Sequence, residues 1–92
     1  MDYIIYGYQI IPGSDDIISF AATQTECEQA ALERRAGLRA NDPSPNEMTG
    51  SAVYRFVVRS MNTAELLLVM NGEASVTDVA SVSRRLVALV AD

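Results

Sequence analysis

The sequence contains no lysine, no histidine and no tryptophan, and it has a single cysteine, Cys27. A serine or cysteine nucleophile needs a neighbouring base, usually histidine, and Schiff-base chemistry needs lysine. Zinc sites are commonly built from clusters of cysteine and histidine. These absences exclude the common catalytic and zinc-binding arrangements. We therefore expect a protein that is not an enzyme and that holds neither a metal nor a cofactor.

Long hydrophobic segments are also missing. The longest uninterrupted apolar runs cover residues 86–91 and 66–70, both far short of the ~20 residues that cross a membrane as a helix. The N-terminal residues lack the positive charge of a signal peptide, and one cysteine cannot form an internal disulfide. With 49% hydrophobic and 21% charged residues in a chain of 92, the sequence predicts one soluble domain over residues 1–92 and a cytoplasmic location.

Charge is distributed unevenly along the chain. The seven basic residues are all arginines and begin only at Arg34, so the residues before Arg34 carry −6 and the remainder carries +1, which gives the net charge of −5. This balance disfavours general phosphate binding and favours a basic partner, either a basic protein or a ribonucleoprotein complex. The candidate partner-binding acids are Asp15, Asp16, Glu26, Glu28 and Glu33.

Three segments have the composition of strands. Residues 3–11 and 17–22 are rich in β-branched and aromatic residues and flank the turn sequence PGSDD, so they predict an antiparallel hairpin that pairs Ile11 with Ile17. Residues 52–59 predict a third strand. The expected core face of the hairpin carries Ile4, Tyr6, Tyr8, Ile10, Ile18 and Phe20. Gly7, inside the first strand, indicates a bulge or a close approach of backbone.

Three segments have helix signals. The first helix is expected to begin at Thr23 or Thr25, because a capping-box pattern starts at each of them. It should run to about Ala40, with Cys27 buried on the face that packs against the sheet. A loop over residues 41–51 follows. Residues 62–72 favour a helix, with a fourth strand as the alternative. Residues 75–90 predict a last helix, because Ser75 caps it and an apolar stripe repeats at spacings of three and four: Val76, Val79, Val82, Leu86, Leu89 and Val90.

These elements predict an α+β fold. We expect a three-stranded, possibly four-stranded, antiparallel sheet with two to three helices packed on one face, in the order ββαβαα. Helices of small residues, such as the alanine-rich one, pack closely on a sheet.

The arginines form two groups. Arg55 and Arg59 share the face of the third strand that we expect to be outside the core, where Tyr3 joins them, and arginine beside an aromatic ring on an open sheet can bind single-stranded RNA. The others, Arg34, Arg35 and Arg39, lie near the end of the first helix, where they complement its dipole. All five are candidate basic contacts, including contacts with guide RNA.

At the level of a class, the chain resembles the small acidic proteins by which phages block host defences, of which anti-CRISPR proteins are the best-known group. The resemblance rests on the 92 residues, the hairpin-then-helix pattern, the acidic stretch from Asp2 to Glu33 and the lack of catalytic residues. It implies a non-enzymatic phage inhibitor, in the cytoplasm of the bacterial host. Such an inhibitor docks on a basic surface of a nucleic-acid-handling complex, such as a CRISPR effector, and blocks target binding.

Two other functions remain open at this stage. One is a small structural or adaptor protein that dimerises through the predicted C-terminal helix. The other is a single-stranded RNA binder that uses Arg55 and Arg59. The sequence leaves open whether the protein is a monomer or a homodimer.

Overall fold

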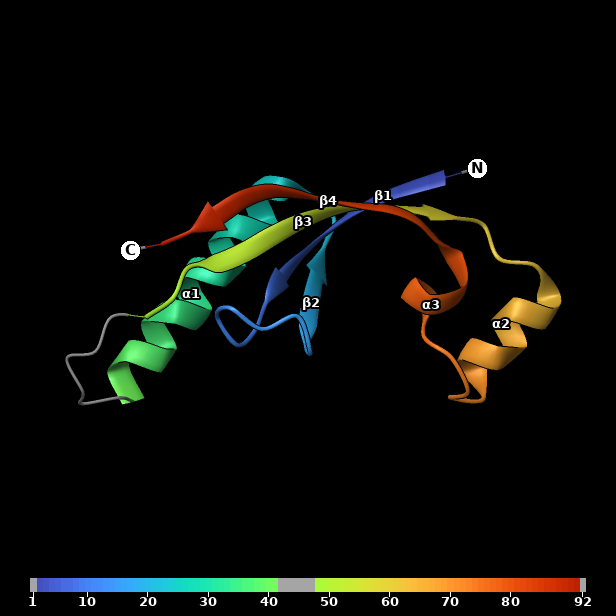
Figure 1. The fold of residues 1–92 in the computed structure, drawn as a ribbon, viewed down its shortest axis with the longest axis horizontal. Helices are drawn as coiled ribbons and strands as arrows, with labels where there is room; N and C mark the ends of the chain where they lie inside the picture. The colour runs from blue at the N-terminus through green and yellow to red at the C-terminus, as the bar shows by residue number, and fades with distance from the viewer. Residues whose placement is uncertain (1, 42–47, 92) are drawn as a thin grey trace.

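The strands form one antiparallel sheet in the order β2-β1-β3-β4. The structure, a computed structural model, describes residues 2–41 and 48–91, so the predicted loop 41–51 lies largely outside the described residues. The molecule is elongated, 49 × 24 × 16 Å, with α1 near one end of the long axis and α2 and α3 near the other (Figure 1). The elements are β1 (Asp2–Gln9), β2 (Ile18–Ala21), α1 (Gln24–Asn41), β3 (Ser51–Arg59), α2 (Thr63–Met70), α3 (Val76–Ala80) and β4 (Ser81–Val90).

The α+β class and a four-stranded antiparallel sheet are confirmed. The fourth strand is β4, however, and not the stretch 62–72 that was the predicted alternative, and the predicted order ββαβαα is wrong. The order is ββαβααβ, because the predicted helix over 75–90 is the short helix α3 followed by strand β4. Ser75 caps α3 as expected. Beyond it, two irregularities in the pairing with β3 leave Val82 and Val87 without a direct partner. Side chains on one face of a strand normally recur every two residues, but each extra residue makes this spacing three, as between Leu86 and Leu89. The apolar residues of β4 therefore recur at intervals that resemble those of a helix.

The predicted hairpin exists, but its register differs by one residue. Gln9 pairs with Ile18, and Gly7 with Phe20. A slip of one residue moves side chains to the other face, so Ile18 and Phe20 do not share a face with Tyr6 and Tyr8 as predicted. They lie over Gly7, where an added Cβ would come within 2.6 Å of Ile18 Cγ2. Gly7 is therefore a site of close packing, but the groups that approach it are side chains and not the predicted backbone.

Helix α1 packs on the sheet through small side chains. The first of the predicted caps is used, since Thr23 Oγ1 accepts a hydrogen bond from the Glu26 backbone N–H (3.2 Å). Cys27 and Ala31 are fully buried against Val53 of β3. The predicted burial of the Cys27 thiol is confirmed, and burial together with nearby Glu28 raises its pKa to about 11.

The helices do not share one face of the sheet, contrary to prediction. The core under α1 contains Val53, whereas Ala80 of α3 packs with Phe56 and Val58. Residues three and five positions apart on a strand point to opposite faces. Helices α1 and α3 therefore cover opposite faces, and each leaves part of its own face open.

The ambiguous stretch 62–72 is helical, as favoured. Asn62 caps α2 with a complete capping box, in which its side chain accepts from the Glu65 backbone N–H and the Glu65 carboxylate accepts from the Asn62 N–H. Gly72, with φ of 73°, ends it. None of the eight residues of α2 is buried.

Candidate protein-binding groove

An apolar groove of about 360 Å³ opens between β2 and α3 on the face that α3 partly covers. Its floor comes from the two central strands, and its walls come from the edge strand β2 and the start of α3. Phe20 remains half exposed here and meets the Phe56 ring edge-on, with the ring centroids 5.4 Å apart. The lining residues are Ile5, Phe20, Phe56, Val58, Ser75, Val76 and Thr77.

The groove continues into a second hollow of about 440 Å³, which is polar and acidic. The two hollows share Phe20, Phe56, Ser75 and Thr77, so they form one surface with an apolar part and an acidic mouth. Charged groups enter only the second hollow. Among the described residues, those that line it with a charge are Asp15, Asp16, Asp78 and Arg84.

Asp15 joins the turn after β1 to three strands. Its carboxylate accepts hydrogen bonds from Gln9 Nε2 (2.7 Å), Tyr54 Oη (2.8 Å) and Arg84 Nη2 (2.7 Å). These donors, that of Gln9 most of all, hold the pKa of Asp15 below its usual range, while burial and the bond to Asp15 raise the pKa of Tyr54. Arg84 also stacks on the Tyr54 ring, 4.1 Å from its centroid. Asp15 is thus a structural hub as well as part of the mouth.

The other two acids of the mouth, Asp16 and Asp78, are exposed and are not paired with an arginine in the described contacts. Asp78, in the first turn of α3, completes the capping box of Ser75: its carboxylate accepts from the Ser75 backbone N–H (3.1 Å). This bond and the Ser75 hydroxyl lower the pKa of Asp78. Asp16 is exposed, and its backbone N–H donates to Ser14 Oγ (3.2 Å). With Arg84 balancing Asp15, the mouth carries net negative charge from Asp16 and Asp78 at neutral pH.

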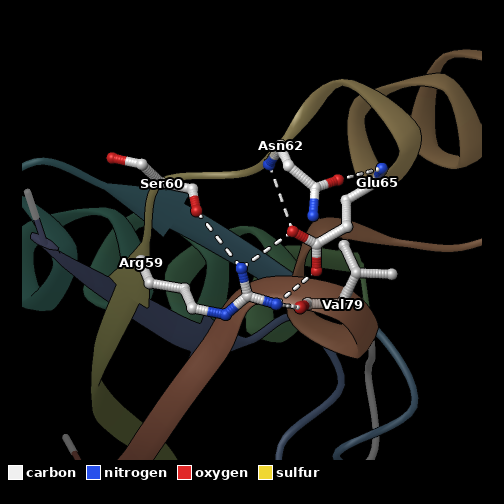
Figure 2. Close-up of polar contacts among 5 residues, drawn as sticks. All are labelled: Arg59, Ser60, Asn62, Glu65 and Val79. Carbon is white, nitrogen blue, oxygen red and sulfur yellow. Dashed lines mark hydrogen bonds and ion pairs between the residues drawn. The ribbon is translucent and has the colours of Figure 1, made fainter.

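At the far side of α3, Arg59 fastens both short helices to the sheet (Figure 2). Its guanidinium forms a bidentate ion pair with the Glu65 carboxylate of α2 and donates to the Val79 carbonyl of α3 (2.6 Å) and the Ser60 carbonyl (3.2 Å). Arg59, followed by the Asn62 N–H, lowers the pKa of Glu65 to about 2. Arg59 therefore acts as a clamp on α2 and α3.

The remaining predicted acids do not join the groove. Glu26, Glu28 and Glu33 belong to α1, which covers the opposite face of the sheet. Their contact with a partner stays a prediction, and together with Asp15 and Asp16 they make two separate acidic areas rather than one.

The predicted arginines of α1 have different surroundings. Arg35 is 1% exposed and donates to the Thr49 carbonyl (2.6 Å), Ser51 Oγ (3.1 Å) and the Met48 carbonyl (3.5 Å). Through these hydrogen bonds the buried Arg35 guanidinium attaches the segment that precedes β3 to α1. The Arg35 side chain is therefore not available to a partner. Arg34 is exposed with Nε 3.4 Å from the Ile10 carbonyl, and Arg39 is exposed in the last turn.

The predicted grouping of Tyr3 with Arg55 and Arg59 is wrong. Tyr3 pairs with Val58, so it lies on the opposite face from Arg55, which pairs with Tyr6. The face of Arg55 is also not outside the core, because Val53 on the same face is fully buried under α1. The grouping with Tyr3 that motivated the RNA-binding alternative is therefore absent. The aromatic residue opposite Arg55 is Tyr6, and RNA binding stays a prediction.

Sequence reasoning missed two surfaces. The groove depends on the register of β2 and on the short helix α3 followed by β4, whereas one long helix was predicted over residues 75–90. The second surface is the exposed helix α2, where the apolar side chains of Leu66, Leu67, Leu68 and Met70 are between 39% and 74% exposed. The apolar run 66–70 was its signal, since it covers all sides of a helix and so leaves no polar side to face water.

Comparisons with protein-family models, with curated proteins and with solved structures found no match for this chain. Within residues 2–41 and 48–91 no group of three or more His, Cys, Asp or Glu side chains is arranged to hold a metal ion. Over the same residues, no helix has the length and hydropathy needed to cross a membrane.

Proposed function

We propose that this protein is a non-enzymatic binding protein that takes a segment of another protein, both apolar and basic, into the groove between β2 and α3. The observation that carries the proposal is the junction of an apolar floor with an acidic mouth. An apolar side chain placed over Phe20 and Phe56 would release water from both surfaces. An arginine or lysine beside it would meet Asp16 and Asp78.

The two parts of the groove contribute differently to such binding. Burial of apolar area supplies most of the affinity, whereas exposed carboxylates mainly accelerate association and select the partner. Asp16 and Asp78 lie at the surface, so their attraction is screened by salt. The partner is therefore a protein segment with hydrophobic anchors beside positive charge.

A segment of this chemistry is common on basic surfaces that handle nucleic acid. The groove supports the partner class expected from the resemblance to phage inhibitors, with Asp16 and Asp78 in place of the acids of α1. A CRISPR effector as the partner, and contact with its guide RNA, remain proposals that rest on that resemblance.

The proposal is tested with two synthetic peptides, one alternating leucine with arginine and one alternating leucine with glutamate. We expect the arginine peptide to shift the backbone amide resonances of Phe20, Phe56 and Thr77, and the shift to weaken as NaCl rises from ~0.05 to ~0.5 M. The glutamate peptide should leave them unchanged. Phe20→Ser should weaken binding most and Asp16→Asn less.

Glu33→Gln is the matched control for Asp16→Asn, because it removes a carboxylate that is also exposed but belongs to α1. It should not alter binding. If both peptides bind equally, or if the shifted resonances belong to α1, the groove is not the binding site and the proposal fails.

A further inference from the structure

The C-terminal part of α2 is apolar on all sides, and none of the residues of α2 is fully buried. Between Leu66 and Met70 every residue is apolar, and Met70 is 74% exposed. Helices that are apolar all round are found in the interior of proteins or in membranes, and isolated helices of this length are not stable in water. The polar contacts of α2 lie at its first turn, where Glu65 meets Arg59 and Asn62. Its apolar part extends beyond that attachment.

The molecule is more extended and has more accessible surface than a compact monomer of its length. The radius of gyration is 15.0 Å, against about 12 Å for a compact domain of this length. The accessible surface is 5992 Å², about 750 Å² above the value usual for a monomer of 10.0 kDa. A standard protein–protein interface removes about 800 Å² from each partner. The excess, summed over the whole surface, is about as large as the area that one interface would cover.

The lack of unpaired charge favours a second copy of the chain as the occupant. The run 66–70 carries no charge, and the one charged residue of α2, Glu65, is already paired with Arg59. Two copies of α2 can therefore pack together without burying an unpaired charge, which would be costly. Two-fold symmetry places the same patch against itself, so a patch that is apolar and uncharged is complementary to its own copy.

Other occupants fit the charge less well. Helices that lie on membrane surfaces have a basic polar face, whereas residues 60–83 contain no arginine and three acids, Glu65, Glu73 and Asp78. The same lack of positive charge disfavours nucleic acid. A basic partner would be attracted to the acidic mouth of the groove rather than to α2.

We infer that the protein is a homodimer in which α2 of one copy packs against α2 of the other about a two-fold axis. No α2 residue lines the described groove, so the dimer leaves both grooves open to their partners. The C-terminal segment, where a dimer contact was predicted on a helix, is strand β4. Its arginines Arg84 and Arg85 and its irregular pairing are features that discourage edge-to-edge association of strands.

Sedimentation equilibrium over a concentration series tests the inference. We expect the wild type to form a species of twice 10.0 kDa. Leu67→Glu and Met70→Glu should each raise the dimer dissociation constant at least ~100-fold, because each copy would then bury an unpaired carboxylate. Leu89→Glu is the matched control, since Leu89 is as exposed as these residues but belongs to β4. It should sediment like the wild type, and circular dichroism should show all variants folded.

Four results would overturn the inference. The wild type could stay monomeric at every concentration, or the dimer could survive Leu67→Glu and Met70→Glu combined. The dimer could also be lost in the control Leu89→Glu or in the groove variant Phe20→Ser. A monomer that cosediments with phosphatidylcholine vesicles would also overturn it and assign α2 to lipid. The groove variant separates the two proposals, because it should lose peptide binding and keep the dimer.

Discussion

The two ends of the sheet differ in how far their helices are buried. At the α1 end, Cys27, Ala31 and Val53 are fully buried and Arg35 is satisfied by acceptors of the chain before β3. At the other end, α2 buries none of its residues and is held by an exposed ion pair. The first end uses its apolar side chains for its own core. At the second end, α2 presents its apolar side chains to the outside, which is the pattern of a binding surface.

The largest expected effect lies at the α1 end. Arg35→Met removes a buried guanidinium and leaves the Thr49 carbonyl and Ser51 Oγ without its hydrogen bonds. We expect a loss of roughly 3 kcal/mol in the free energy of unfolding, because buried acceptors left unpaired are costly. Urea denaturation measures it. Arg34→Met, at the exposed neighbour, should stay within about 0.5 kcal/mol of the wild type.

The next effect concerns the strand between the two ends. In Gly7→Ala the new Cβ would lie 2.6 Å from Ile18 Cγ2 and 3.1 Å from the Phe20 ring. Overpacking of this kind costs about 1–3 kcal/mol, and moving Phe20 should also weaken peptide binding in the groove. The matched change Gly37→Ala meets nothing within 4 Å and should stabilise α1 by about 0.5–1 kcal/mol. Equal effects of the two changes would refute the close packing at Gly7.

The open end should respond to pH in a defined window. The pKa of Glu65 is lowered from 4.5 to about 2 by Arg59. A carboxylate whose pKa is lowered in the folded state stabilises that state fully above its unfolded pKa, and this contribution is lost as the pH falls from about 4.5 to about 2. The protection factors of the α2 amides, which correct for the pH dependence of intrinsic exchange, should therefore fall over this window. In Glu65→Gln they should already be low at neutral pH and change less across the window.

The smallest expected effect is at α2 itself. Leu67→Glu should change the unfolding free energy of the monomer by no more than about 0.5 kcal/mol, because the side chain is exposed and contributes little to the core. The measurement is made by urea denaturation at a concentration where the wild type is monomeric. A much larger loss would show that α2 belongs to the core of its own chain.

The successes of the sequence prediction are local. Thr23, Asn62 and Ser75 cap the helices that their capping patterns indicated, because a cap bonds to backbone only a few residues away. The strand over 52–59 and the burial of Cys27 were predicted for the same reason, from short-range patterns of apolar residues.

The failures concern contacts between distant residues. The two irregularities that make β4 look helical exist only through its pairing with β3. Asp15 meets Arg84 across 69 positions of sequence, and Arg59 meets the Val79 carbonyl across 20. No local pattern shows which acid or arginine finds an internal partner. Hence the predicted site mixed structural residues, such as Arg35 and Asp15, with exposed ones, such as Asp16.

Hydrogen exchange of the wild-type protein, compared at low and high concentration, tests the difference between the two ends most directly. We predict that amides of α1 and β3 are strongly protected at both concentrations, because they open only when the core does. Amides of α2 should be weakly protected at low concentration and gain protection as the dimer forms. Equal protection of α1 and α2 at low concentration, with no change on raising it, would contradict the account.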